Sequence, residues 1–98
     1  MERRFFVYIL ASDRMGTLYV GVTSNLVRRT WQHREHVVDG FTARYGVTKL
    51  VYFEIHATAE AAIHREKRLK HWPRDWKLNL IERDNPTWND LFDPIASF

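Results

Sequence analysis

The chain has 98 residues, a formal net charge of +3 and no cysteine. This length allows one small domain with one core, and the absence of cysteine excludes disulfides and thiolate metal sites within the sequence. Such a domain depends on packing alone, and its composition is compatible with the reducing cytoplasm, where we expect the protein.

The first apolar segment, from Phe5 to Ala11, predicts a central β-strand. Its residues are apolar on both faces, as in strands that are covered on both sides. The segment is far too short to cross a bilayer, so we expect no interaction with membranes.

A turn at 12–16 and an alternating segment at 17–23 complete a predicted hairpin. A four-residue loop would pair Ala11 with Gly16 and would place Tyr8 directly opposite Tyr19. A slip of one residue would put the two tyrosine side chains on opposite faces of the sheet, so the register decides whether they can share a site.

The pattern then changes to helical. Thr23, Ser24 and Asn25 are good N-cap residues, and a helix is predicted over about 25–36. Its apolar stripe consists of Leu26, Val27, Thr30, Trp31 and Val37. At about 100° per residue, Arg29 and His33 fall together on one flank of that stripe, at the rim of the core.

The later elements are predicted from helix-capping residues and from glycine and proline, which end regular secondary structure. We expect a helical turn at 41–45, a strand at 49–56, a helix from Thr58 to 71–72, a helix from Pro73, and a short helical piece from 85–86 to Pro94. No linker or repeat divides the chain. We therefore expect one domain at 1–98, with its core at about 5–81 and a short C-terminal helical extension.

One carboxylate lies where the pattern predicts burial. The helix at 59–72 places Ala62, Ile63 and Leu69 on one face, and Glu66 lies near the middle of that face. An unpaired charge there would cost several kcal/mol. We therefore expect a compensating cation, hydrogen bonds or a metal ion.

Cations cluster in the same region. They are Arg65, Lys67, Arg68, Lys70, Arg74 and Lys77. This cluster suits a polyanion such as nucleic acid, although a solvated helix face carries the same pattern.

Together these features resemble the GIY-YIG nucleases. Val7-Tyr8-Ile9 and Tyr19-Val20-Gly21 are similar to the paired signature of that family. The residues that follow in the family's order are Asn25, Leu26, Arg29, His33, Glu66 and Asn79. The resemblance covers about 5–81 and is closest to small stand-alone bacterial members. Val7 in place of the first glycine, and Val22 where some relatives place a lysine, depart from the pattern.

The resemblance implies an α+β fold, with a three-stranded antiparallel sheet flanked by helices and a site on one sheet face. It also implies a metal-dependent endonuclease that acts on nucleic acid, DNA more than RNA, with one divalent cation, Mg²⁺ or alternatively Mn²⁺. The implied catalytic residues are Tyr8, Tyr19, Arg29, His33 and Glu66, and Asn79 joins the cations as a nucleic-acid-binding residue. DNA repair is among the family's roles.

The resemblance and the chemistry of phosphodiester hydrolysis suggest a role for each of these residues. Glu66 would bind the metal ion, and Arg29 would hold the scissile phosphate through its planar fork. Tyr8 would accept a proton from the attacking water, which requires a lowered pKa. Tyr19 would position water or phosphate, and His33 would orient Tyr8 or shuttle a proton.

Two other classes of function remain open. A non-catalytic nucleic-acid-binding module would use the same cations and aromatic residues. A protein-interaction domain would use Trp72, Trp76 and Trp88 as anchors, although these tryptophans suit a core better. His33 and His36 resemble a short metal-ligand pair, and His64 and His71 share a helix face. Without cysteine and without HExxH spacing, the sequence does not favour a zinc site.

Overall fold

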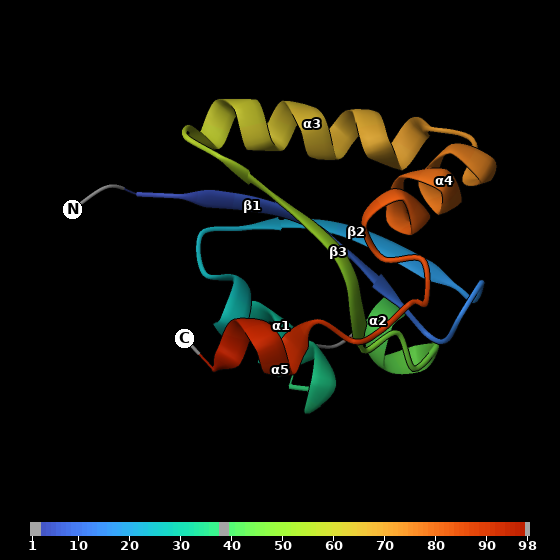
Figure 1. The fold of residues 1–98 in the computed structure, drawn as a ribbon. Coiled ribbons are helices and arrows are strands. Elements are labelled where there is room, and N and C mark those ends of the chain that lie inside the picture. Colours follow the sequence, from blue (N-terminus) through green and yellow to red (C-terminus); the bar gives the residue numbers. More distant parts are fainter. Residues whose placement is uncertain (1–2, 38–39, 98) are drawn as a thin grey trace.

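The computed structural model describes residues 3–37 and 40–97. A three-stranded antiparallel sheet has the strand order β2-β1-β3 and is flanked by helices (Figure 1). The strands are β1 (Phe5–Ala11), β2 (Leu18–Thr23) and β3 (Lys49–His56). The helices are α1 (Leu26–Arg34), α2 (Phe41–Arg44), α3 (Ala59–His71), α4 (Arg74–Asp84) and α5 (Phe92–Ala96). The predicted α+β class is confirmed.

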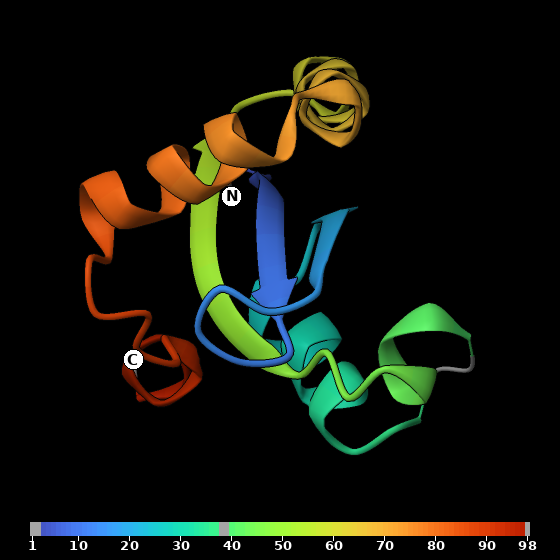
Figure 2. The same ribbon diagram turned by 90° about the vertical axis from the view of Figure 1, so that its right-hand side faces the viewer.

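The central strand β1 is covered on both faces, as its two-sided apolar pattern predicts. Val7 and Ile9 pack in one core cluster with buried residues of α3 and α4. Tyr8 and Leu10 pack on the other face, in a second cluster with Leu26 of α1. In Figure 2, which looks nearly along α3, the helices α3 and α4 lie on one side of the sheet and α1, α2 and α5 lie on the other.

The hairpin register differs from the predicted one by two residues. Tyr19 pairs with Leu10, and Tyr8 lies directly opposite Gly21. The direct pairing of Tyr8 with Tyr19 was therefore wrong. Because a shift of two residues preserves the side-chain alternation, both tyrosines still face the same side of the sheet.

The helix α1 is rotated relative to the predicted stripe. Its buried residues are Leu26, Thr30 and His33, whereas Val27 and Trp31 are exposed. His33 therefore lies in the core rather than at its rim. The difference arises because both ring nitrogens of His33 have hydrogen-bond partners, the Tyr8 hydroxyl and Oγ1 of Thr42, which allows this polar residue to be buried.

Most element boundaries agree with the sequence pattern to within one or two residues. Strand β3 spans the predicted residues, and α3 begins directly after its cap, Thr58, whose side chain accepts a hydrogen bond from the Ala61 amide. The C-terminal helix α5 differs from the predicted helical piece. It begins at Phe92 and includes Pro94, which was predicted to end it. A proline in the first helical turn lacks only an N–H that would have no partner within the helix.

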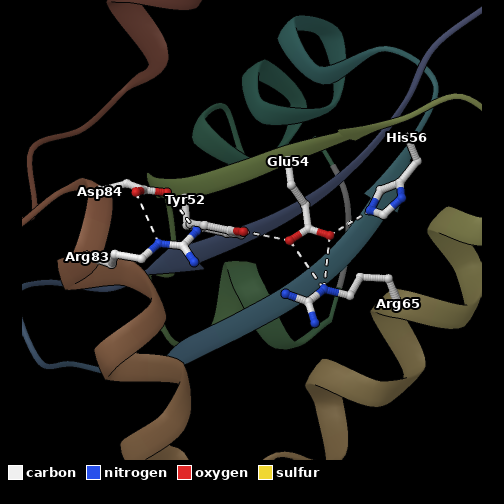
Figure 3. Close-up of polar contacts among 6 residues, drawn as sticks. All are labelled: Tyr52, Glu54, His56, Arg65, Arg83 and Asp84. Atoms are coloured by element: carbon white, nitrogen blue, oxygen red, sulfur yellow. Dashed lines mark hydrogen bonds and ion pairs between the residues drawn. The ribbon is translucent and has the colours of Figure 1, made fainter.

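A polar cluster joins β3 to α3. The partly buried carboxylate of Glu54 accepts hydrogen bonds from the Tyr52 hydroxyl (2.6 Å) and from Arg65 Nε (3.0 Å). His56 Nε2 lies 2.6 Å from the same carboxylate (Figure 3). The guanidinium of Arg65 also lies over the ring of Trp72, 5.0 Å from its centroid. These contacts fix the rotation of α3 about its own axis.

None of the helices in the described part of the chain combines the length and the apolar character needed to cross a bilayer.

Candidate active site

The site begins with the close approach of Tyr8 to Gly21. A Cβ atom on Gly21 would lie 2.4 Å from both Cζ and Oη of Tyr8. The phenol ring therefore lies directly over the glycine backbone of β2, which forms an edge of the sheet. Only glycine leaves this space. The Tyr8 hydroxyl is thereby directed to the β2 edge of the sheet.

The hydroxyl of Tyr8 lies at one end of a buried hydrogen-bonded row. It is 3.2 Å from Nε2 of His33, and Nδ1 of His33 is 2.9 Å from Oγ1 of Thr42. Burial, followed by the positive charge of Arg29, lowers the pKa of His33 to about 4. The imidazole is therefore neutral near pH 7. A tautomer that donates from Nδ1 to Thr42 leaves Nε2 free to accept the Tyr8 proton.

The phenol of Tyr8 is held in its protonated form. Burial is the largest cause and raises its pKa to about 12. A hydrogen-bonding interaction with Arg29 opposes this shift, whereas the charge of Glu66 adds to it. The sequence-based scheme requires a lowered pKa for Tyr8, and the protein alone provides the opposite.

Tyr19 and Arg29 complete this face of the site. The ring centroid of Tyr19 lies 6.4 Å from that of Tyr8 and 5.4 Å from that of His33. Arg29 is half-buried, and its Nη1 donates to the side chain of Gln32 (3.2 Å). Arg29 lowers the pKa of both Tyr8 and His33. The rings of Tyr8, Tyr19 and His33 therefore lie close together.

Glu66 approaches the same edge from the other face of the sheet. Ala62 and Leu69 are the buried residues of α3, and at about 100° per residue Arg65 and Glu66 flank that buried line on opposite sides. Arg65 is directed to β3, where it binds Glu54. Glu66 therefore lies on the β2 side of α3, and its charge contributes to the raised pKa of Tyr8.

Of the three kinds of compensation expected for the Glu66 charge, the structure contains a cation. The Glu66 side chain is only 12% exposed, and its Oε2 lies 2.9 Å from Nζ of Lys70, four residues later on α3. Ile63, which was predicted to share the buried face, is exposed. Glu66 is therefore at the border of the buried face, where it can be paired with Lys70 and still be reached from solvent.

The donor set at this edge fits a hard divalent cation. The single carboxylate of Glu66 supplies oxygen ligands and leaves most positions to water and substrate. Among residues 3–37 and 40–97, no group of three or more His, Cys, Asp or Glu side chains could hold a metal ion. Magnesium, which keeps several of its waters, suits this arrangement better than zinc.

The residues predicted to bind nucleic acid are in two situations. Arg65 is bound to Glu54, Lys70 to Glu66, and Arg74 donates to the carbonyl oxygens of Met15 and Gly16. Lys77 donates to the carbonyl of Lys70. The other residues are exposed: Lys67 and Arg68 on α3 and Asn79 on α4. Lys67 and Arg68 also line a groove with Trp72 and Trp76.

Two residues that hold candidate site side chains in place, Thr42 and Gly21, were not among the predicted site residues. Thr42 is buried and holds His33 in place, but a lone threonine in a short helical turn gives no signal in a single sequence. Gly21 carried a signal, since a glycine inside a strand pattern indicates close approach by another group. Its partner was not recognisable because it depends on the hairpin register.

Comparison with known proteins identifies the family. The GIY-YIG catalytic domain matches residues 4–79. This chain belongs to the GIY-YIG family. The family is one of nuclease-type domains, so GIY-YIG membership implies nucleic acid as the class of substrate.

The relatives of this GIY-YIG chain are small. A UPF0213 protein of Oceanobacillus iheyensis is 34% identical over 82 residues, which cover 84% of this chain and 94% of that protein. A UPF0213 protein of Clostridium perfringens is 38% identical over 76 residues, covering 78% and 81%. The solution NMR structure of a UPF0213 protein from Bacillus halodurans is similar, with a TM-score of 0.55, 26% identity and coverage of 89% and 92%. The similarity therefore extends over most of this chain and most of each of these relatives.

Proposed function

We propose that this protein is a metal-dependent nuclease that hydrolyses phosphodiester bonds in nucleic acid, DNA more than RNA. One observation carries the proposal: Tyr8 and His33 form a buried hydrogen-bonded pair, and the charges of Arg29 and Glu66 both act on the pKa of Tyr8. Phosphodiester hydrolysis requires charge stabilisation on the phosphoryl oxygens, an activated water, and help for the leaving oxygen.

Tyr8 and His33 act together on the attacking water in this proposal. Because burial holds Tyr8 in its protonated form, the phenol passes its own proton to Nε2 of His33 as it accepts one from water. Nδ1–H of the resulting imidazolium donates to Thr42. The negative charge of a bound phosphodiester favours this imidazolium and opposes the effect of Arg29.

The other residues bind and orient the phosphate, the attacking water and the metal ion. The guanidinium of Arg29 holds the phosphate by paired hydrogen bonds, which a planar fork makes well. Tyr19 positions the water or the phosphate from its place beside Tyr8 and His33. Glu66 would hold the divalent cation, for which Lys70 would give up its contact with the carboxylate. The cation, when bound, supplies charge stabilisation to the phosphoryl oxygens.

A cleavage assay with matched variants tests the proposal. The substrates are single-stranded, nicked and branched DNA, with RNA of the same sequence, in Mg²⁺ and in EDTA. Glu66→Gln should lower the cleavage rate at least about 100-fold, as expected for loss of a metal ligand. Glu60→Gln alters an exposed carboxylate in the first turn of the same helix and should leave the rate unchanged. EDTA should stop cleavage, and added Mg²⁺ or Mn²⁺ should restore it.

Two outcomes would contradict this assignment. Glu66→Gln protein that cleaves as fast as wild type would remove the metal site from the mechanism. Wild-type protein that binds these substrates without cleaving any of them would instead favour a non-catalytic nucleic-acid-binding module.

A further inference from the structure

A row of aromatic side chains leads outward from the site. The ring of Tyr19 stacks on that of Phe41, with 6.4 Å between centroids and 28° between planes. Phe41 in turn contacts Tyr45, with 4.8 Å between centroids. Phe41 and Tyr45 are 46% and 51% exposed. The row therefore begins beside Tyr8 and His33 and ends in solvent.

The fold does not need these two exposed rings for its core. The segment that carries them is anchored by buried neighbours: Thr42, which is bonded to His33, and Val47, which packs with Tyr8 in the second core cluster. The amide of Val47 also donates to the carbonyl of Thr42 (2.9 Å). Phe41 and Tyr45 stand outside these anchors. Large exposed apolar side chains that adjoin a site are typical of binding surfaces.

The charge around the row suits a polyanion. Arg44 lies between the two rings in sequence, and its guanidinium is 5.8 Å from the ring centroid of Tyr45. Arg29 lies at the inner end, beside Tyr8. The sequence from Gly40 to Thr48 contains no Asp or Glu. Aromatic rings between two cations are the pattern with which proteins bind unpaired nucleotides.

We propose that Phe41 and Tyr45 stack unpaired nucleobases next to the scissile phosphate, so that the site takes single-stranded or locally unpaired nucleic acid. The position of the scissile phosphate rests on the nuclease function proposed above. Because the bases of a continuous duplex are stacked on one another, their faces are not available to Phe41 and Tyr45. The aromatic row therefore selects unpaired strands over duplex, without a preference for a particular base sequence.

Binding measured without cleavage tests this inference. The probes are fluorescently labelled oligothymidine and a blunt hairpin of mixed sequence, titrated in EDTA and followed by anisotropy. Phe41→Leu and Tyr45→Leu should each weaken oligothymidine binding about tenfold, the order expected for one lost base–aromatic stack. Hairpin binding should change less than about twofold. Phe41→Trp and Tyr45→Trp should retain oligothymidine binding because they keep a stacking surface.

Two control variants separate this surface from others. Trp31→Leu removes a 48% exposed aromatic side chain on α1 and should leave both affinities unchanged. Trp76→Leu removes a 56% exposed ring from the groove that Lys67 and Arg68 line. A loss of oligothymidine binding confined to Trp76→Leu would overturn the assignment of base stacking to Phe41 and Tyr45.

The remaining outcomes distinguish this inference from the nuclease proposal. Equal loss of oligothymidine and hairpin binding in Phe41→Leu and Tyr45→Leu, or no loss of either, would overturn the inference, even if the protein cleaves DNA. A selective loss of oligothymidine binding in a protein that cleaves no substrate would overturn the nuclease proposal and would leave the binding surface in place. Wild-type protein that binds neither probe would overturn the inference, and the cleavage assay would then decide the nuclease proposal separately.

Discussion

Replacement of Gly21 by alanine tests whether the close approach of Tyr8 builds the site. The added Cβ would lie 2.4 Å from Cζ and Oη of Tyr8. Since carbon atoms in contact are about 3.5 Å apart, the ring must move by about 1 Å or more. Tyr8 is almost completely buried and is hydrogen-bonded to His33, so this movement cannot occur without cost.

The sign of the stability change distinguishes this effect from an ordinary substitution. Gly21 does not have a positive φ, and at such a position an alanine without a clash would stabilise the protein by about 0.4–1 kcal/mol through the unfolded state. Overpacking against Tyr8 should instead destabilise it by about 1–3 kcal/mol. A displacement of about 1 Å in a proposed catalytic group should also lower the cleavage rate about 100-fold.

A double-mutant cycle measures the contact directly. The free energy of unfolding in urea is compared for wild type, Gly21→Ala, Tyr8→Ala and the double variant. Once the ring is removed, Gly21→Ala should cost little, which corresponds to a coupling energy of about 1–3 kcal/mol. Additive effects, or Gly21→Ala protein that is more stable than wild type and equally active, would refute the account of how Tyr8 is placed.

Two further predictions concern titratable groups on the two faces of the sheet. The pKa of His33 is about 4 in the folded protein and about 6.5 in the unfolded chain. Between these values the unfolded chain binds more protons, so the stability of the protein falls as the pH is lowered. Between pH 7.5 and pH 5, the free energy of unfolding in urea should therefore fall by about 2 kcal/mol more for wild type than for His33→Asn. Parallel plots of the free energy of unfolding against pH for the two proteins would contradict this. Glu54→Gln should lower the free energy of unfolding by about 2 kcal/mol at pH 7, since Arg65 and His56 lose a charged partner. Because hydrogen bonds from Tyr52, Arg65 and His56 lower the pKa of Glu54 despite its burial, that difference should shrink as the pH falls below about 4.5; a difference independent of pH would show that the charge of Glu54 is unimportant.

The strands were predictable from the sequence because each carries a strong local pattern. Strand β1 is apolar on both faces and lies in the centre of the sheet, and β3 has the expected bounds. The register of β1 on β2 was not predictable, because the loop over Ser12 to Thr17 forms its own side-chain and backbone hydrogen bonds and is longer than a four-residue turn. Loop geometry fixes hairpin register, and alternation alone fixes only the face.

For the candidate site, the sequence suggested residues but not the electrostatics of their surroundings. Glu66 stood out because a carboxylate on an apolar helix face needs a partner, and Lys70 is that partner. The neutral state of His33 and the raised pKa of Tyr8 follow from burial that only the fold creates. The rotation of α1 was equally hidden, because the polar His33 is buried while the more apolar Val27 and Trp31 are exposed.

Manganese binding followed by NMR tests the central claim most directly. Substoichiometric Mn²⁺, a paramagnetic substitute for Mg²⁺, is added to labelled wild type, Glu66→Gln and Glu60→Gln. The account predicts that amide signals around Glu66, Tyr8 and Tyr19 broaden first in wild type and in Glu60→Gln, and that this broadening is lost in Glu66→Gln. Broadening centred on Glu54 and His56, or broadening at the β2 edge that persists in Glu66→Gln, would contradict a metal site at Glu66.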